Sequence, residues 1–222
     1  MEEGASFCKP TSIAHAKLLL VEGRDEFNFF SSLLEHIGVD DIEIREVGGK
    51  DKFPSELPAV LKDPGFGLVR IYGIIRDADT SADNTFRSVQ GLLRKHREPV
   101  PGKVNDFASH PGQSRKVGVF ILPGNSATGM LEELCLNTVE DHPIMPCVEG
   151  FIQCIESKAR DASLEPNRYK LPKCMPKAKA RAFLAGMCED VPSVGIGAQK
   201  KCWNLDHPRL DLLRGFLEHF RG

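Results

Sequence analysis

Residues 16–38 read AKLLLVEGRDEFNFFSSLLEHIG and contain an apolar run followed by an amphipathic segment. The run 16–21 stops at Glu22 and Gly23, as a buried strand does when it enters a turn. Beyond the turn, apolar side chains recur at helical spacing, at Phe27, Phe30, Leu34 and Ile37. This stretch predicts a strand, a tight turn and a helix packed against the strand.

The same alternation of strand and helix continues along the chain. Further strands are predicted at 42–47 (IEIREV), 68–75 (LVRIYGII) and 117–122 (VGVFIL), with helices near 55–62 and 83–95. Strands that alternate with helices favour a parallel sheet, because each crossover helix returns the chain to the same edge. The predicted fold class is therefore α/β, with a Rossmann-like parallel sheet and helices on both of its faces.

The remaining segments predict the domain organisation. Residues 96–116 are polar and rich in Pro and Gly, which predicts a long loop or insertion. Residues 141–222 have mainly helical patterns, near 144–156, 177–188 and 208–220. We therefore expect an α/β domain over residues 1–140 and a helical C-terminal extension over 141–222 packed on it.

Composition indicates a globular protein with an uneven distribution of charge. The 222 residues are 41% hydrophobic and 27% charged, which excludes wholesale disorder, and the net charge is −2. Residues 1–60 carry 6 basic and 12 acidic side chains, whereas residues 157–201 carry 10 basic and 4 acidic ones. This asymmetry suggests a cation site beside a polyanion track, although solvated surface explains it equally well.

Seven cysteines are present, and none forms a C-x-x-C pair, so a zinc ribbon is not expected. We expect the thiols to be reduced and mostly buried, as in a cytoplasmic protein. The chain has no apolar run of 18 residues and no signal-peptide pattern. A membrane partner is therefore not expected, whereas a partner protein or a homo-oligomer is compatible with the sequence.

Acidic residues follow three of the predicted strands. Glu22 and Glu26 follow the first, Asp77 and Asp79 follow the third, and Glu132 lies in the helix after the fourth. Reactive groups collect at the carboxyl ends of parallel strands, where like charges raise one another's pKa unless a cation is present. Oxygen ligands alone favour Mg²⁺ or Mn²⁺. The sequence thus predicts one or two such ions, against the alternative that these are surface or capping residues.

These motifs resemble those of the Toprim domain. Val21-Glu22-Gly23 and Asp77-x-Asp79 match its strand-end pattern, while Glu26 and the LEEL stretch around Glu132 are similar to OLD-type nucleases and small stand-alone Toprim proteins. The resemblance covers about residues 16–140. It implies a Toprim-like fold and Mg²⁺-dependent cutting or joining of phosphodiesters. It further implies that Glu22 is a catalytic acid–base or metal ligand, that Asp77 and Asp79 bind metal, and that Glu26 and Glu132 bind a second ion.

The expected activity is therefore metal-dependent phosphoryl transfer on DNA or RNA, as in a nuclease. The basic segment 157–201 is expected to dock the nucleic acid. Within it, Lys177 and Arg181 share a helical face, and Lys177 is the candidate that holds phosphate or stabilises developing charge. A solvated face is the alternative for these cations.

Two other functions stay open. Residues 77–81, DADTS, resemble the nucleophile loop of haloacid dehalogenase-type phosphatases, although that loop normally follows the first strand. A non-catalytic binding or regulatory protein could also retain this fold. Transfer of phosphate to Asp77 would distinguish the phosphatase, and weak Mg²⁺ binding would indicate the non-catalytic protein.

Overall fold

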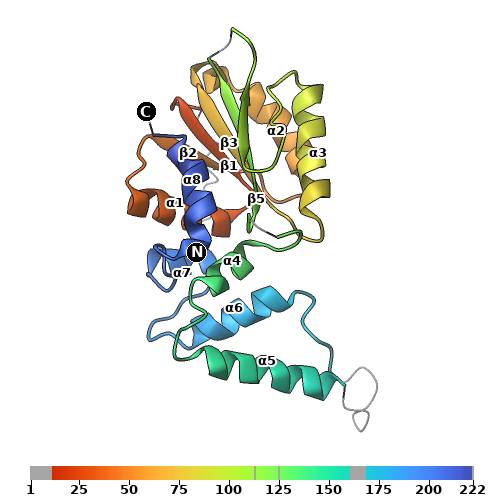
Figure 1. Cartoon of the computed structure of the whole chain (residues 1–222), viewed down its shortest axis with the longest axis vertical. Helices are drawn as coiled ribbons and strands as arrows, with labels where there is room; N and C mark the ends of the chain where they lie inside the picture. Colours follow the sequence, from red (N-terminus) through yellow and green to blue (C-terminus); the bar gives the residue numbers. More distant parts are fainter. Residues whose placement is uncertain (1–11, 113, 125, 161–168, 222) are drawn as a thin grey trace, which may run out of the picture.

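A five-stranded sheet forms the centre of the computed structural model, which describes residues 12–112, 114–124, 126–160 and 169–221 (Figure 1). Its strand order is β2-β1-β3-β5-β4. The four strands β1, β2, β3 and β5 are parallel, and β4 pairs antiparallel to β5 at one edge. The strands are β1 (Lys17–Val21), β2 (Ile42–Glu46), β3 (Ile71–Asp77), β4 (Asp106–Ser109) and β5 (Lys116–Leu122).

Helices cover both faces of this sheet, so the predicted α/β class is confirmed (Figure 1). Side chains alternate along a strand, and in β1 Leu18 and Leu20 face one hydrophobic cluster while Leu19 and Val21 face the other. The helical elements are α1 (Arg24–Ile37), α2 (Phe53–Leu61), η1 (Pro64–Leu68), α3 (Ala82–Lys95), α4 (Leu131–Asn137), α5 (Met145–Ala159), α6 (Met175–Ala185), α7 (Val194–Gln199), η2 (Pro208–Leu210) and α8 (Asp211–Glu218).

Each face has its own set of helices. Side chains of α2 and α3, including Phe53 and Val89, pack in the cluster that contains Leu18 and Leu20. Side chains of α1 and α8, including Phe29 and Phe216, pack in the cluster on the opposite face. Because α8 is the last helix, the end of the chain contributes directly to the core of the sheet.

The prediction of a loop over residues 96–116 was wrong for its second half, which contains the edge strand β4. This strand has only four residues, Asp106–Ser109, and Phe107 is its one large apolar residue, so its sequence shows no period-two pattern. Its aromatic side chain, Phe107, stacks on Phe216 of α8 with ring centroids 4.7 Å apart. Gly118 of β5 lies against the same ring, and a Cβ atom there would collide with it.

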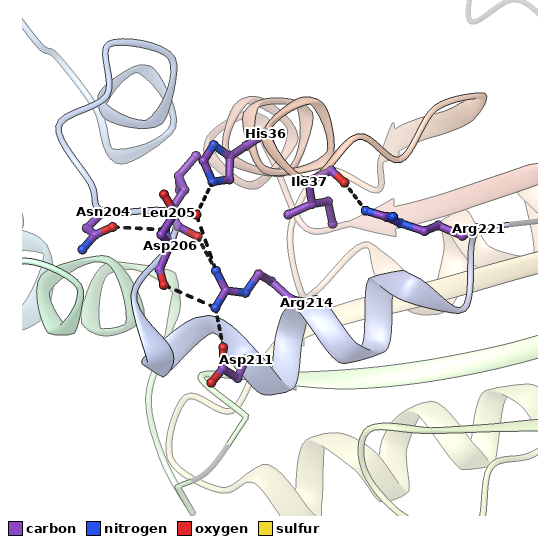
Figure 2. A network of polar contacts seen from close by, with 8 residues as sticks. All are labelled: His36, Ile37, Asn204, Leu205, Asp206, Asp211, Arg214 and Arg221. Atoms are coloured by element: carbon purple, nitrogen blue, oxygen red, sulfur yellow. Dashed lines mark hydrogen bonds and ion pairs between the residues drawn. The ribbon is translucent and has the colours of Figure 1, made fainter.

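A polar network ties the C-terminal helix to the end of α1 (Figure 2). His36 Nε2 lies 2.8 Å from Asp206 Oδ1, and an Arg214 guanidinium nitrogen donates to the Asp206 carbonyl oxygen at 3.3 Å. Arg221 donates to the carbonyl oxygen of Ile37. These contacts fix α8 along the sheet face that α1 also covers.

Helices α5 and α6 form a pair that lies beyond α4, at the end of the molecule away from the strands (Figure 1). An ion pair between Lys179 of α6 and Glu149 of α5 links the two helices. None of the helices within the described residues is long and apolar enough to cross a membrane.

The expectation that most cysteines are buried was wrong. Of those in the described residues, Cys135 is buried, but Cys147, Cys154 and Cys188 are exposed, and Cys8 lies outside the described residues. The reason for two of them is the position of α5, which packs on one side only and leaves the rest of its surface in solvent. The cysteines that the structure describes are free thiols.

Candidate metal and catalytic site

The ends of β1 and β3 lie next to each other because the two strands are parallel neighbours, with Leu20 opposite Ile74. Glu22 immediately follows β1, and Asp77 is the last residue of β3. The backbone N–H of Asp77 donates to Glu22 Oε1 at 3.2 Å. The register of the sheet therefore brings together two acidic residues that are 55 positions apart in the sequence.

Asp77 is the most strongly perturbed of these carboxylates. Burial raises its pKa well above the usual range, and the negative charges of Glu22, Glu26 and Glu132 raise it further. A hydrogen bond of 3.1 Å from the backbone N–H of Leu131, the first residue of α4, to Asp77 Oδ1 opposes this shift. Four carboxylates, which we call the carboxylate cluster, thus interact electrostatically: Glu22, Glu26, Asp77 and Glu132.

Glu26 lies in the first turn of α1 and folds back toward the strand end. Its Oε2 atom would lie 3.4 Å from a Cβ atom built on Gly23, which places the carboxylate beside the turn that follows β1. Burial raises the pKa of Glu26, and the charges of Glu22 and Glu132 raise it as well. Glu26 therefore belongs to the cluster and is not a freely solvated helix charge.

The two adjacent glutamates of α4 point in different directions. Glu132 is buried, and its Oε1 atom lies 3.6 Å from Lys177 Nζ of α6. Glu133 instead accepts a hydrogen bond of 3.0 Å from the backbone N–H of Met130 and so caps its own helix. This difference is the one expected for residues about 100° apart on a helix, and it places Glu132 in the cluster.

Arg76 is a site residue that the sequence analysis missed. Its Nε atom donates to Glu22 Oε1 at 2.5 Å, and its guanidinium carbon lies 4.9 Å from the centroid of the Phe53 ring. The side chain is buried, which requires a partner for its charge. The available signal was an arginine between the apolar run 68–75 and Asp77, but its partner becomes evident only from the pairing of β1 with β3.

Asp79 forms contacts with Lys50 and Gly129. Its Oδ2 atom accepts a hydrogen bond of 3.0 Å from Lys50 Nζ, and its backbone forms a pair of hydrogen bonds with Gly129, at 2.9 and 3.1 Å. The residue has a positive φ of 49°, so the chain turns between Asp77 and Asp79. Lys50 also interacts electrostatically with Glu22, so this lysine lies between Asp79 and the cluster, and metal binding by Asp79 stays a prediction.

The donor chemistry of the cluster fits a hard divalent cation. Its four members offer only carboxylate oxygens, and a cation would offset both the burial of charge and the repulsion that raise the pKa values of Asp77 and Glu26. No three His, Cys, Asp or Glu side chains in the described part of the chain are already placed to hold a metal ion. Ligation by this cluster therefore requires side-chain rotation.

Comparison with known proteins gives one family match. The family model described as "Protein of unknown function (DUF3226)" matches residues 16–221. No curated protein gives a significant match to the chain.

Among solved structures, two C-terminal regions of OLD proteins are similar to this chain. The C-terminal region of the Xanthomonas campestris pv. campestris OLD protein is 17% identical, with a TM-score of 0.47, over 93% of this chain and 95% of that one. The C-terminal region of the Burkholderia pseudomallei OLD protein is 12% identical, also with a TM-score of 0.47, over 94% and 98%. Identities this low leave function to be inferred from the residues of this chain.

Proposed function

We propose that this chain, which belongs to the family of proteins of unknown function DUF3226, is a Toprim-like nuclease that uses Mg²⁺ or Mn²⁺ to cleave phosphodiester bonds. The observation that supports this proposal is the carboxylate cluster at the ends of β1 and β3 and the start of α4. Burial and mutual repulsion raise the pKa values of two of its members, Asp77 and Glu26. Acidic groups perturbed in this way are typical of functional sites.

Glu22, Glu26, Asp77 and Glu132 would hold one or two divalent ions in this proposal. Such ions, when bound, polarise a phosphoryl group and lower the pKa of a coordinated water. The chain supplies the rest of the site. Arg76 fixes the orientation of Glu22 through its 2.5 Å hydrogen bond, and the N-terminal N–H of α4 fixes Asp77.

Lys177 is the cation best placed to stabilise negative charge on a phosphate. Burial alone would lower its pKa, but the charges of Glu132 and Asp77 raise it above its ordinary value. The ammonium group therefore remains protonated at neutral pH. At 3.6 Å from Glu132 it lies at the rim of the carboxylate cluster, where it can bind a phosphate oxygen as charge develops.

A non-catalytic binding protein is the second candidate, and the Arg76–Glu22 ion pair favours it. The guanidinium already balances one charge of the cluster, so the fold does not need a metal to accommodate Glu22. A non-catalytic protein would bind Mg²⁺ weakly and would leave nucleic acids intact.

Cleavage assays distinguish the candidates. Purified protein is incubated with single- and double-stranded DNA and RNA in Mg²⁺, in Mn²⁺ and in EDTA, beside Asp77→Asn, Glu132→Gln and the control Glu149→Gln. Glu149 pairs with Lys179 between α5 and α6, outside the cluster. We expect cleavage only with metal, a loss of at least about 100-fold in the two cluster variants, and normal activity in the control.

Metal affinity provides a readout that does not depend on activity. Calorimetric titration with Mn²⁺ is expected to show binding to wild-type protein and to Glu149→Gln, and much weaker binding to Asp77→Asn. Equal cleavage by the wild type and Asp77→Asn would contradict the proposed site. Detection of an aspartyl-phosphate at Asp77 after incubation with a phosphomonoester would support the phosphatase instead.

A further inference from the structure

An open apolar groove runs between α5 and α6. Its volume is about 840 Å³, and its lining includes Val148, Phe151 and Ile155 of α5 with Ala178 and Ala182 of α6. Grooves of about 300–1,000 Å³ accommodate small organic groups such as a base. We call this feature the α5–α6 groove.

Two aromatic side chains of the groove remain accessible to solvent. Phe151 is 51% exposed and Tyr169 is 40% exposed, and both are among the lining residues. The hydrophobic effect favours burying such rings in a monomer, so their exposure beside a groove indicates a surface that binds a ligand. Exposed aromatic rings are the groups on which unpaired bases stack.

Cations line the same groove. Lys173, Lys177 and Arg181 follow one another at intervals of four residues, which places Lys177 and Arg181 on one side of α6. Among the described residues, neither Lys173 nor Arg181 forms an ion pair with an acidic side chain. Their charges are therefore available to an anionic ligand.

Lys177 connects the groove to the carboxylate cluster. It lines the groove, and its Nζ atom also lies 3.6 Å from Glu132 Oε1. Lys173 likewise lines both this groove and a second hollow that contains Lys50 and Asp79. These two lysines thus lie between the α5–α6 groove and acidic residues near the strand ends, Glu132 and Asp79.

We propose that the α5–α6 groove binds single-stranded nucleic acid, with bases against Phe151 and Tyr169 and phosphates along Lys173, Lys177 and Arg181. A duplex does not fit this arrangement, because its bases are paired and stacked and cannot reach the apolar floor. The inference rests on the proposed function in one respect, namely that the bound strand leads to the carboxylate cluster. The occupancy of the groove itself is tested without cleavage.

Fluorescence anisotropy with a labelled 15-nucleotide single strand and the matching duplex tests the proposal, in EDTA and again in Ca²⁺. We expect the wild type to prefer the single strand, and Phe151→Ala to weaken single-strand binding about 10-fold with little change for duplex. Arg181→Gln should weaken binding and make the slope of log K against log[salt] shallower by about 0.7, the value for one phosphate contact with a single strand. Leu212→Ala and Lys95→Gln, which change an exposed apolar residue of α8 and an exposed cation of α3, serve as controls.

Each outcome decides for or against the groove. The same single-strand affinity in Phe151→Ala as in the wild type, or no binding by wild-type protein in either buffer, would overturn the proposal. So would a dimer in light scattering that Phe151→Ala converts to monomer, since a second copy would then occupy the groove. Loss of single-strand binding in Phe151→Ala without any metal-dependent cleavage would support the groove while refuting the nuclease. Metal-dependent cleavage with the same KM in Phe151→Ala as in the wild type would support the nuclease while refuting the groove.

Discussion

Arg76 and Glu22 form a buried ion pair at the edge of the carboxylate cluster. The Nε atom of Arg76 lies 2.5 Å from Glu22 Oε1, and the side chains are 9% and 13% exposed. The guanidinium group of Arg76 is therefore a fixed positive charge beside four acidic side chains. This relationship orients Glu22 toward the end of β3, where its Oε1 atom also accepts the N–H of Asp77.

Replacement of Arg76 by methionine should lower the free energy of unfolding by about 3 kcal/mol, because it leaves a buried carboxylate without its partner. Urea unfolding at pH 7 measures this loss. Arg209→Met is the control, since Arg209 lies 4.0 Å from Glu140 in an exposed pair and should contribute less than about 1 kcal/mol. Equal destabilisation by both substitutions would show that the Arg76 pair has no special role.

Stability of the metal-free protein should depend on the charge state of Asp77. Its pKa is raised above the ordinary 3.8, and that of Glu26 above 4.5, so the folded protein holds protons that the unfolded chain has lost. The resulting stabilisation is fully present below the ordinary values and is lost as pH rises through the raised values. Asp77→Asn should therefore raise the melting temperature in EDTA at pH 8 by a few degrees and have little effect near pH 4.

Differential scanning fluorimetry from pH 4 to pH 8 measures this dependence. Below pH 4, Asp63 has the opposite effect on stability. Hydrogen bonds, that from Ser12 first, hold its pKa well below the usual range, so its contribution to stability is lost as the pH falls. In the presence of Mg²⁺ the order should reverse, with the wild type gaining stability and Asp77→Asn gaining none. A constant difference between the two proteins across the pH range would contradict the assigned cause.

Lys177 should affect catalysis far more than folding. Its side chain is 52% exposed, so Lys177→Ala should change the free energy of unfolding by less than about 1 kcal/mol. The proposed role in stabilising charge predicts a fall in kcat of about 100-fold. Lys179→Ala provides the comparison on the same helix, because Lys179 pairs with Glu149 and not with the cluster. Similar kcat values for the two variants would remove Lys177 from the catalytic site.

The close approach of α7 to α1 predicts a contrast between two glycines. A Cβ atom on Gly195 would lie 2.5 Å from the carbonyl oxygen of Asp25 and 2.8 Å from Asn28 Cβ, whereas one on Gly215 meets nothing within 4 Å. Gly195→Ala should therefore destabilise the protein by about 1–3 kcal/mol. Gly215→Ala in α8 should stabilise it by about 0.4–1 kcal/mol. Thermal unfolding in EDTA measures both, and a stable Gly195→Ala protein would show that α7 can move.

The sequence predicts the parallel strands well because their apolar runs end sharply in acidic residues or glycines. The first strand and the turn at Glu22 and Gly23 are examples, since both depend on local sequence alone. The edge strand β4 was not predicted, because its stability comes from pairing with β5 and from the contact of Phe107 with Phe216, residues far away in the chain.

Prediction of the candidate site is limited in the same way, because some of its contacts depend on residues that are far apart in the sequence. The order of the motifs was enough to anticipate that Glu22 and Asp77 approach each other. The partner of Arg76 depends on strand register, and the direction of Asp79 depends on a backbone turn paired with Gly129. These are properties of the assembled sheet, which spacing along the chain does not encode.

Helices α5 and α6 lie away from the strands and form a unit that could be exchanged between related proteins (Figure 1). Phe183 of α6 stacks on Trp203, and Lys177 contacts Glu132, so a hybrid that receives the pair from another member of the family has to preserve this apolar packing as well as the polar contact. Under the proposed function, such a hybrid would change the α5–α6 groove while the carboxylate cluster stays constant.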